Sequence, residues 1–198
     1  MKNILLIGNS KNVMNSEFIK KTSVSFDHVC RFNHNWAHIY DTVKLYTGDW
    51  FDTLITSNFA HDQSISELLK YHLLNKVNKI FLICPNSKHR TKINKINKEY
   101  EEITDEEYNT IQLILHKYGF PINRKIARTG ITSIIYFSFI KKYNVFIYGM
   151  DVHGTDNPLD QHIAKNHKLD MNMHSIDEES KLLQRLLQDN HITLYDNI

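Results

Sequence analysis

Short, uninterrupted apolar runs alternate along this chain with longer segments in which apolar residues recur at helical spacing. The apolar runs occupy residues 3–7, 28–32, 53–56, 79–84, 144–148 and 192–195. Continuous runs of this length are typical of strands that are buried on both faces of a parallel sheet. Helices are expected at residues 16–21, 64–77, 105–118, 129–143 and 175–190. The alternation predicts an α/β fold: one Rossmann-like domain over residues 1–198, with a largely parallel sheet flanked by helices.

The composition fits one globular domain with a sizeable core. Of the 198 residues, 41% are apolar and 23% are charged, which argues against disorder. A formal charge of +2 gives no general attraction to nucleic acid. The 12 histidines are scattered among polar residues, which favours surface positions over a metal site.

The sequence also favours a cytoplasmic location. The apolar run at residues 3–7 is far too short to span a membrane and is not followed by a cleavage signal, and no other segment approaches the length of a span. Cys30 and Cys84 fall in expected buried strands and lack the close spacing of a metal-binding pair. A reducing interior is therefore the simpler interpretation.

Small and polar residues end three of the expected strands. They are Gly8, Asn9, Ser10, Asn33, Gly149 and Asp151. Right-handed crossovers place such strand ends on one rim of a parallel sheet, where ligands bind in folds of this kind. We therefore expect a ligand site on that rim, although turn formation after a strand explains the asparagines about equally well. Arg31, inside the second strand, is expected to serve the fold or the sheet edge.

A hydroxyl-rich turn opens the helix expected from residue 129. The first N–H groups of a helix have no intrahelical partner and lie at the positive end of its dipole. Backbone donors and hydroxyl groups of Thr129, Gly130 and Thr132 would together hold an anion. A simple helix cap is the alternative, because the chain has neither a P-loop lysine motif nor the Gly-x-Gly-x-x-Gly pattern. We expect no divalent metal, since Asp49 and Asp52 do not form an Asp-x-Asp pair.

Two further segments allow alternative interpretations. Residues 87–100 are rich in lysine and residues 101–107 are acidic, for which a solvated helical face is the simpler interpretation. The lysines from Lys88 to Lys98 offer the alternative of peripheral contact with an anionic membrane surface. Residues 152–173 form the longest stretch without a regular pattern, which predicts a lid or an acceptor loop.

Three motifs, taken in order, resemble the sialyltransferases of glycosyltransferase family 29, and more distantly the bacterial sialyltransferases of family 42. Gly8-Asn9-Ser10 with Arg31-Phe32-Asn33 is similar to the long sialyl motif. Arg128-Thr129-Gly130 with its following apolar run is similar to the short one, and His174 with Glu179 fits the His-x-x-x-x-Glu motif. The resemblance spans residues 4–179, and the order of the motifs is far more specific than any one of them.

The chain departs from both families at identifiable positions. The aromatic-rich third motif of family 29 is not evident, although His153, His162 and His167 fall in its interval. Where family 42 has a tyrosine that faces the leaving phosphate, this chain has His153.

The resemblance implies a variant GT-A-like fold and an inverting transfer of sialic acid from CMP-sialic acid to a hydroxyl group of an oligosaccharide or glycolipid acceptor. It implies no cofactor, because the one phosphate that leaves with CMP does not strictly need a metal. The strand-end residues would hold the donor, with Thr129, Gly130 and Thr132 at its phosphate or ribose. His153 would donate to the leaving oxygen.

His174 is the expected general base. It directly precedes the last expected helix, whose dipole favours the neutral imidazole that a base requires. Glu179 would lie about 140° away on that helix, so we expect it to brace a loop rather than to orient the imidazole. The structural alternative for His174 is a residue next to a helix cap. Two other functions fit the same loops: a transferase for another CMP-activated sugar such as Kdo, and a non-catalytic CMP-binding domain.

Overall fold

The computed structural model describes residues 1–10, 25–47, 49, 51–57, 60–83, 95–122, 127–150, 152 and 175–195. The strands are β1 (Asn3–Ile7), β2 (His28–Phe32), β3 (Thr53–Thr56), β4 (Lys79–Leu82), β5 (Glu99–Glu102), β6 (Asn144–Tyr148) and β7 (Ile192–Leu194). The helices are α1 (Tyr40–Thr47), α2 (His61–Lys70), α3 (Asp105–Lys117), α4 (Thr129–Ile135) and α5 (Ile176–Gln188). Shorter turns are the 3-10 turns η2 (Ala37–Ile39) and η3 (Leu74–Lys76) and the π-helical turn η5 (Tyr136–Ile140).

The strands form one sheet in the order β5-β4-β3-β2-β1-β6-β7, and the pairing of each neighbouring pair is parallel. β1 lies between β2 and β6, and its last residue Ile7 is opposite both Arg31 and Tyr148. Strands β2 to β5 follow on one side of β1, and β6 and β7 lie on the other. The expected α/β class with a largely parallel sheet is confirmed.

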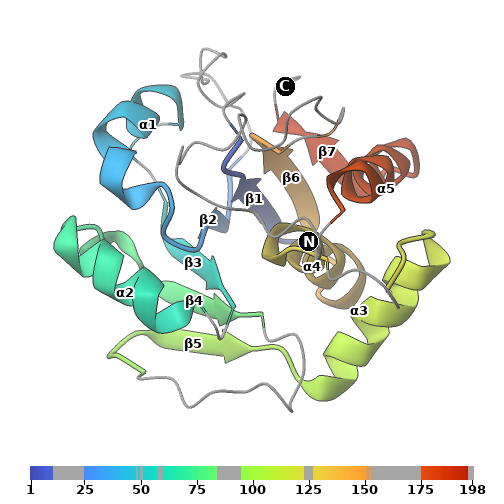
Figure 1. The fold of residues 1–198 in the computed structure, drawn as a ribbon, viewed down its shortest axis with the longest axis horizontal. Coiled ribbons are helices and arrows are strands. Elements are labelled where there is room, and N and C mark those ends of the chain that lie inside the picture. Colours follow the sequence, from blue (N-terminus) through green and yellow to red (C-terminus); the bar gives the residue numbers. More distant parts are fainter. Residues whose placement is uncertain are drawn as a thin grey trace.

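Helices cover both faces of the sheet (Figure 1). Ile4 and Leu6 of β1 belong to a core layer shared with α3, α4 and α5, whereas Leu5 and Ile7 belong to a second layer shared with α1 and α2. Successive side chains of a strand point to opposite faces, so a strand covered on both faces must be apolar throughout. This explains why the β1 sequence is an uninterrupted apolar run.

Both ends of the helix expected at residues 64–77 were predicted wrongly. α2 occupies His61–Lys70, and the chain then passes through His72, with a φ of +57°, into η3. A left-handed residue cannot continue an α-helix. Leu73 and Val77 are buried beyond that turn, so their apolar spacing reflects burial rather than helix.

Residues 87–94 lie outside the described residues, and the helical face expected over the lysine-rich and acidic segments is contradicted at residues 99–102 by strand β5. It pairs with β4 at the edge of the sheet, where Lys79 Nζ lies 2.7 Å from Glu99 Oε1 and 2.8 Å from Glu101 Oε2. Tyr100, between the two glutamates, packs against the core layer of α1 and α2. Cross-strand charge pairs and one partly buried ring therefore hold a sequence of low strand propensity in a strand.

Other boundaries differ by a few residues. β4 ends at Leu82, the helix from residue 129 passes into η5 and ends before Lys142 at φ +58°, and η2 and α1 were not expected. α3 begins at the expected place, after a capping box in which Thr104 and Glu107 bond reciprocally. The short helix expected at residues 16–21 lies outside the described residues. Within the described part of the chain, no helix is long and apolar enough to cross a membrane.

Candidate functional site

The strand order reverses at β1, so the carboxyl ends of β1 and β6 lie side by side where open α/β sheets bind ligands. Gly8 N donates to Tyr148 O at 2.7 Å, and Ser10 N donates to Gly149 O at 3.1 Å. A Cβ atom on Gly8 would lie 2.2 Å from Gly149 O, so only glycine fits there. The structure thus brings together three residues that the sequence singled out: Gly8, Ser10 and Gly149.

Asn9 lies between these two contacts and reaches the end of β2. Its Nδ2 donates to Phe32 O at 3.4 Å. This contact orients the amide, because the reversed amide would place two acceptor oxygens together. The Oδ1 atom of Asn9 is then buried, with no hydrogen-bond partner among the described residues.

Asn33 supplies a second acceptor of the same kind. It follows β2 with a φ of +50°, a left-handed conformation that asparagine adopts more readily than most residues. Its backbone N donates to Ile55 O at 2.9 Å, and its buried Oδ1 also lacks a partner within the described ranges. Buried polar atoms are nearly always paired. Two unpaired acceptors on one rim therefore favour a ligand that brings N–H or O–H donors.

The start of α4 lies beside the end of β6. A Cβ atom on Gly130 would be 3.8 Å from Met150 Cε, and Thr129 and Gly130 are half-buried. The first N–H groups of a helix have no intrahelical acceptor. Thr132 differs, because its N–H and its hydroxyl donate to Arg128 O at 3.0 and 3.2 Å. The geometry favours Thr129 and Gly130 over Thr132 as donors to an anion.

Glu179 of α5 is buried and contacts the residue that begins α4. Its Oε1 accepts from Arg128 N at 2.9 Å, and its Oε2 accepts from Arg128 Nε. Arg128 is the N-cap residue of α4 and makes no side-chain cap bond of its own. A carboxylate from a different helix therefore holds the start of α4. Arg128 is not among the site residues expected from the sequence, because Arg128 and Glu179 are 51 positions apart.

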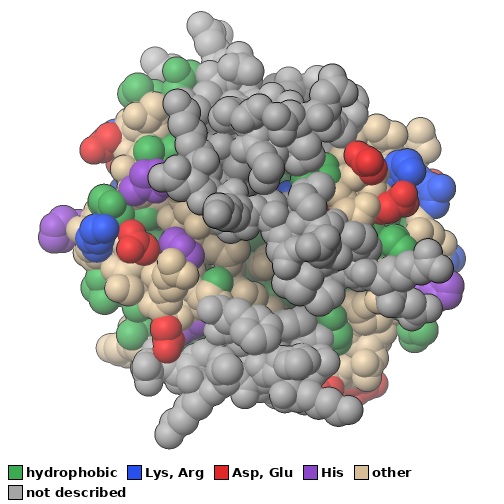
Figure 2. Space-filling view, in the orientation of Figure 1, with side chains coloured by type: hydrophobic (Ala, Val, Ile, Leu, Met, Phe, Trp, Pro, Cys, Tyr) green, Lys and Arg blue, Asp and Glu red, His purple; other side chains and the backbone are tan. Residues whose placement is uncertain are grey.

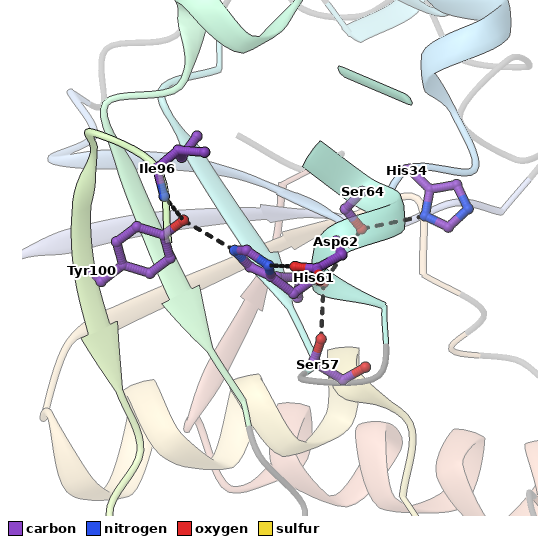
Figure 3. A network of polar contacts seen from close by, with 8 residues as sticks. His34, Ser57, His61, Asp62, Ser64, Ile96 and Tyr100 are labelled. Atoms are coloured by element: carbon purple, nitrogen blue, oxygen red, sulfur yellow. Dashed lines mark hydrogen bonds and ion pairs between the residues drawn. The ribbon is translucent and has the colours of Figure 1, made fainter. Parts of the chain in front are cut away.

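A polar network ties α2 to the edge strand β5 (Figure 3). His61 Nδ1 lies 2.7 Å from Asp62 Oδ1, and His61 Nε2 lies 3.0 Å from Tyr100 Oη, which also accepts from Ile96 N at 3.2 Å. Burial raises the pKa of Tyr100, so its hydroxyl stays a donor at neutral pH. A surface position was expected for the histidines, and this was wrong for His61, whose side chain is fully buried.

The same helix contacts the loop that carries Asn33. His34 Nδ1 lies 3.3 Å from Ser64 Oγ (Figure 3). Ser64 Oγ in turn lies 3.4 Å from Thr56 Oγ1. Ser64 and Thr56 are fully buried. These contacts fix the residue directly after Asn33. Figure 2 shows most of the visible histidine side chains on the side of the molecule that carries α1 and α2, with another on the opposite side.

Arg31 lies within β2, near the centre of the sheet, so the expectation of a sheet-edge role is wrong. It is buried, and its guanidinium carbon lies 5.3 Å from the ring centroid of Trp36. Burial lowers the pKa of Arg31 to about 10, against the opposing effect of Tyr40 and Tyr148. These contacts support a role in the fold.

Comparisons with known proteins show likeness in fold alone. No family model and no curated protein matches the sequence. The fold is similar to the sialyltransferase CstII from Campylobacter jejuni in complex with cytidine-5'-monophosphate, with a TM-score of 0.60 and 16% identity over 98% of this chain and 79% of that one. The complex of CstII with CMP-3FNeuAc has a TM-score of 0.58 and 18% identity over the same shares of the two chains. An α-2,3-sialyltransferase from Campylobacter jejuni in apo form has a TM-score of 0.57 and 16% identity, over 100% of this chain and 76% of that one. Membership in family 29 is not shown by these matches.

Three expected site residues, Asp151, His153 and His174, lie outside the described residues, as do residues 153–173 of the expected lid. Among the residues that are described, no group of three His, Cys, Asp or Glu side chains is arranged to hold a metal ion. Asp49 instead accepts from Tyr40 Oη at 2.6 Å, and Asp52 accepts from Val29 N at 3.2 Å.

Proposed function

We propose that the chain is an inverting glycosyltransferase that moves sialic acid from CMP-sialic acid to a hydroxyl group of an oligosaccharide or glycolipid acceptor. The observation that carries this proposal is the pair of buried, unpaired amide oxygens of Asn9 and Asn33 at the reversal of strand order. The fold supports it, because two of the similar Campylobacter jejuni structures are complexes with cytidine-5'-monophosphate and CMP-3FNeuAc. The assignment to family 29 rests on the order of the three sequence motifs.

In this proposal the nucleoside supplies the missing donors. Ribose hydroxyl groups and the amino group of cytosine donate hydrogen bonds, and the amide oxygens of Asn9 and Asn33 accept them. Uracil has a carbonyl oxygen where cytosine has its amino group, so an amide oxygen facing that edge would repel it. The loops of Gly8 with Ser10 and of Gly149 with Asp151 would enclose the same nucleotide.

The phosphate is assigned to the start of α4. Backbone N–H groups of Thr129 and Gly130 would donate to its oxygens, and Thr132 would support the turn through its bonds to Arg128 O. The leaving oxygen gains charge as its bond to the sugar breaks, and these donors with His153 would stabilise that charge.

The reaction is a single displacement at the anomeric carbon. The acceptor hydroxyl oxygen bonds to that carbon while the bond to the CMP oxygen breaks, and the hydroxyl proton passes to a base. We assign the base to His174, which directly precedes Ser175, the N-cap residue of α5. Residues 152–173 would close over the acceptor. The segment from Lys88 to Lys98 would place the enzyme against an anionic membrane surface that carries a glycolipid acceptor.

Ligand-dependent stabilisation tests the proposal. A ligand that binds the folded state raises the midpoint of thermal unfolding. The measurement compares CMP, CDP, UMP and UDP, and we expect the largest shift with CMP. A shift with the uridine nucleotides alone would contradict the proposal.

Turnover separates the remaining functions. Release of CMP from CMP-sialic acid is expected, and it should rise when an acceptor glycan is added. Binding of CMP without any release would indicate a non-catalytic CMP-binding domain. Release from CMP-Kdo but not from CMP-sialic acid would indicate a transferase for the other sugar.

A further inference from the structure

The contact between Arg128 and Glu179 uses only part of the guanidinium group. An arginine that merely neutralises a carboxylate usually gives two of its N–H donors to the two carboxylate oxygens. Here the oxygens of Glu179 are divided between Arg128 Nε and the backbone N of the same residue. Among the described residues, nothing accepts a hydrogen bond from the two terminal nitrogens of Arg128.

Burial determines which end of the arginine is held. The side chain of Glu179 is 1% exposed, so its charge depends on Arg128 for compensation. The side chain of Arg128 is 30% exposed. The Nε end is therefore fixed inside the protein, and the terminal nitrogens belong to the part of the side chain that solvent and ligands can reach.

The position of Arg128 relates these nitrogens to the nucleotide rim. Arg128 directly precedes Thr129 and Gly130, and Gly130 lies near Met150 at the end of β6. Arg128 therefore brings a positively charged group next in sequence to the residues that we assign to the phosphate of CMP. A planar guanidinium edge binds a carboxylate with two parallel hydrogen bonds.

We infer that Glu179 is a positioning residue that presents the terminal nitrogens of Arg128 to a carboxylate group of the substrate. This inference rests on the proposed function and deepens it. Sialic acid bears a carboxylate on its anomeric carbon, and CMP has none, so Arg128 contributes to recognition of the sugar rather than of the nucleotide. A neutral sugar would leave the guanidinium without an ionic partner.

The test compares two ligands by isothermal titration calorimetry: CMP, and the 3-fluoro analogue of CMP-sialic acid, which adds the sugar carboxylate. The variants are Arg128→Lys, which keeps the charge without the planar edge, and Glu179→Gln, which cannot accept from both Arg128 N and Nε. The control is Arg185→Lys on the same helix, where Arg185 Nη1 donates to Tyr118 O at 2.6 Å. Arg128→Lys should bind the analogue about 10- to 100-fold more weakly and CMP within about twofold of the wild type. Glu179→Gln, which also loses a contact to the start of α4, should lose more affinity for the analogue than for CMP. The control should bind both ligands as the wild type does.

Each other outcome overturns a defined part of the inference. Equal losses for CMP and the analogue would assign Arg128 to the phosphate, and no loss for either ligand would remove it from the site. A loss with Arg128→Lys but not with Glu179→Gln would overturn the positioning role of Glu179. If Glu179→Gln does not fold, Glu179→Asp replaces it, because it keeps the charge but withdraws it by one methylene. A wild-type protein that binds neither ligand would overturn the proposed function and this inference with it.

Discussion

The carbonyl oxygen of Gly149 occupies the space that a side chain on Gly8 would need. A Cβ atom on Gly8 would meet that oxygen at 2.2 Å and Met150 Cγ at 2.8 Å, and the Gly8 N–H donates to Tyr148 O at 2.7 Å. The first and sixth strands therefore approach so closely beyond their carboxyl ends that the two loops act as one wall of the candidate site.

Replacing Gly8 by alanine should destabilise the protein. The added methyl group meets backbone atoms, which cannot move aside as a flexible side chain can. Overpacking of this kind costs about 1–3 kcal/mol, which for a chain of this length lowers the midpoint of thermal unfolding by roughly 2–12 °C. Circular dichroism on heating measures the change.

Gly130→Ala is the matched control for Gly8→Ala. A Cβ atom there would have Met150 Cε at 3.8 Å and Phe32 Cζ at 3.9 Å, which is ordinary contact. Alanine is favoured over glycine inside a helix by up to about 1 kcal/mol, so this midpoint should stay unchanged or rise by about 2–4 °C. Equal effects of the two substitutions would contradict the close approach at Gly8.

The ion-pair cluster around Glu101 should make stability depend on pH in the acid range. Burial alone would raise the pKa of Glu101, but hydrogen bonds from Lys141, Lys79 and Tyr136 outweigh it and lower the pKa from 4.5 to about 2. The folded value lies below the unfolded one, so the contribution is fully present above about pH 4.5 and is lost as the pH falls toward 2. Unfolding midpoints of the wild type and Glu101→Gln should differ at pH 6 and converge toward pH 2.5.

Glu178→Gln provides the comparison for Glu101. Glu178 pairs with Lys181 at 2.9 Å on the surface of α5, where ion pairs contribute little. The unfolding midpoint of Glu178→Gln should equal that of the wild type at every pH. A Glu101→Gln variant that did the same would show that the cluster does not stabilise the fold.

Asn33→Gly should weaken CMP binding while preserving the fold. Glycine accepts the φ of +50° without strain, so only the amide is lost. The loss of one hydrogen bond to the nucleoside corresponds to a dissociation constant about three- to tenfold higher, which calorimetry can measure. Asn33→Ala should bind CMP as weakly and also unfold at lower temperature, because alanine is strained at this φ. An unchanged CMP affinity in Asn33→Gly would remove Asn33 from the nucleotide site.

His174→Ala should separate chemistry from binding. Loss of a general base lowers the rate of transfer by about two to four orders of magnitude, whereas CMP affinity should stay at the wild-type level. The measurement is the rate of CMP release in the presence of acceptor. His116→Ala, an exposed position in α3, should leave that rate unchanged. Transfer that survives in His174→Ala would exclude this histidine as the base.

The strands that could be located from the sequence are those buried on both faces, where every residue must be apolar. β1 is covered on both faces, so its apolar run could be recognised without knowledge of any partner. β5 could not, because Glu99 and Glu101 are stabilised by Lys79 from the neighbouring strand. The strand propensity of the β5 residues gives no information on where that lysine lies in the fold.

In the candidate site, too, some residues could be predicted from the sequence, whereas other contacts depend on tertiary packing. Asn9 and Asn33 could be singled out because they follow strands, and parallel topology places such strand ends on one rim. The contact of Arg128 with Glu179 depends on how closely two helices approach, and nothing in the spacing of 51 residues fixes that approach. The burial of His61 between Asp62 and Tyr100 likewise depends on the packing of α2 against the edge strand.

The pairing of β1 with β6 also determines when the site can form during synthesis. Asn3 and Asn144 form a hydrogen bond between their side chains across this pair, although they are 141 residues apart in the chain. At typical rates of translation, β6 follows β1 by on the order of ten seconds or more. A nascent chain that stalls in this interval would already carry Asn9 and Asn33 but would lack the Gly149 wall. The capacity to hold a nucleotide should therefore appear late, and slow closure of this long-range contact should limit the rate of folding.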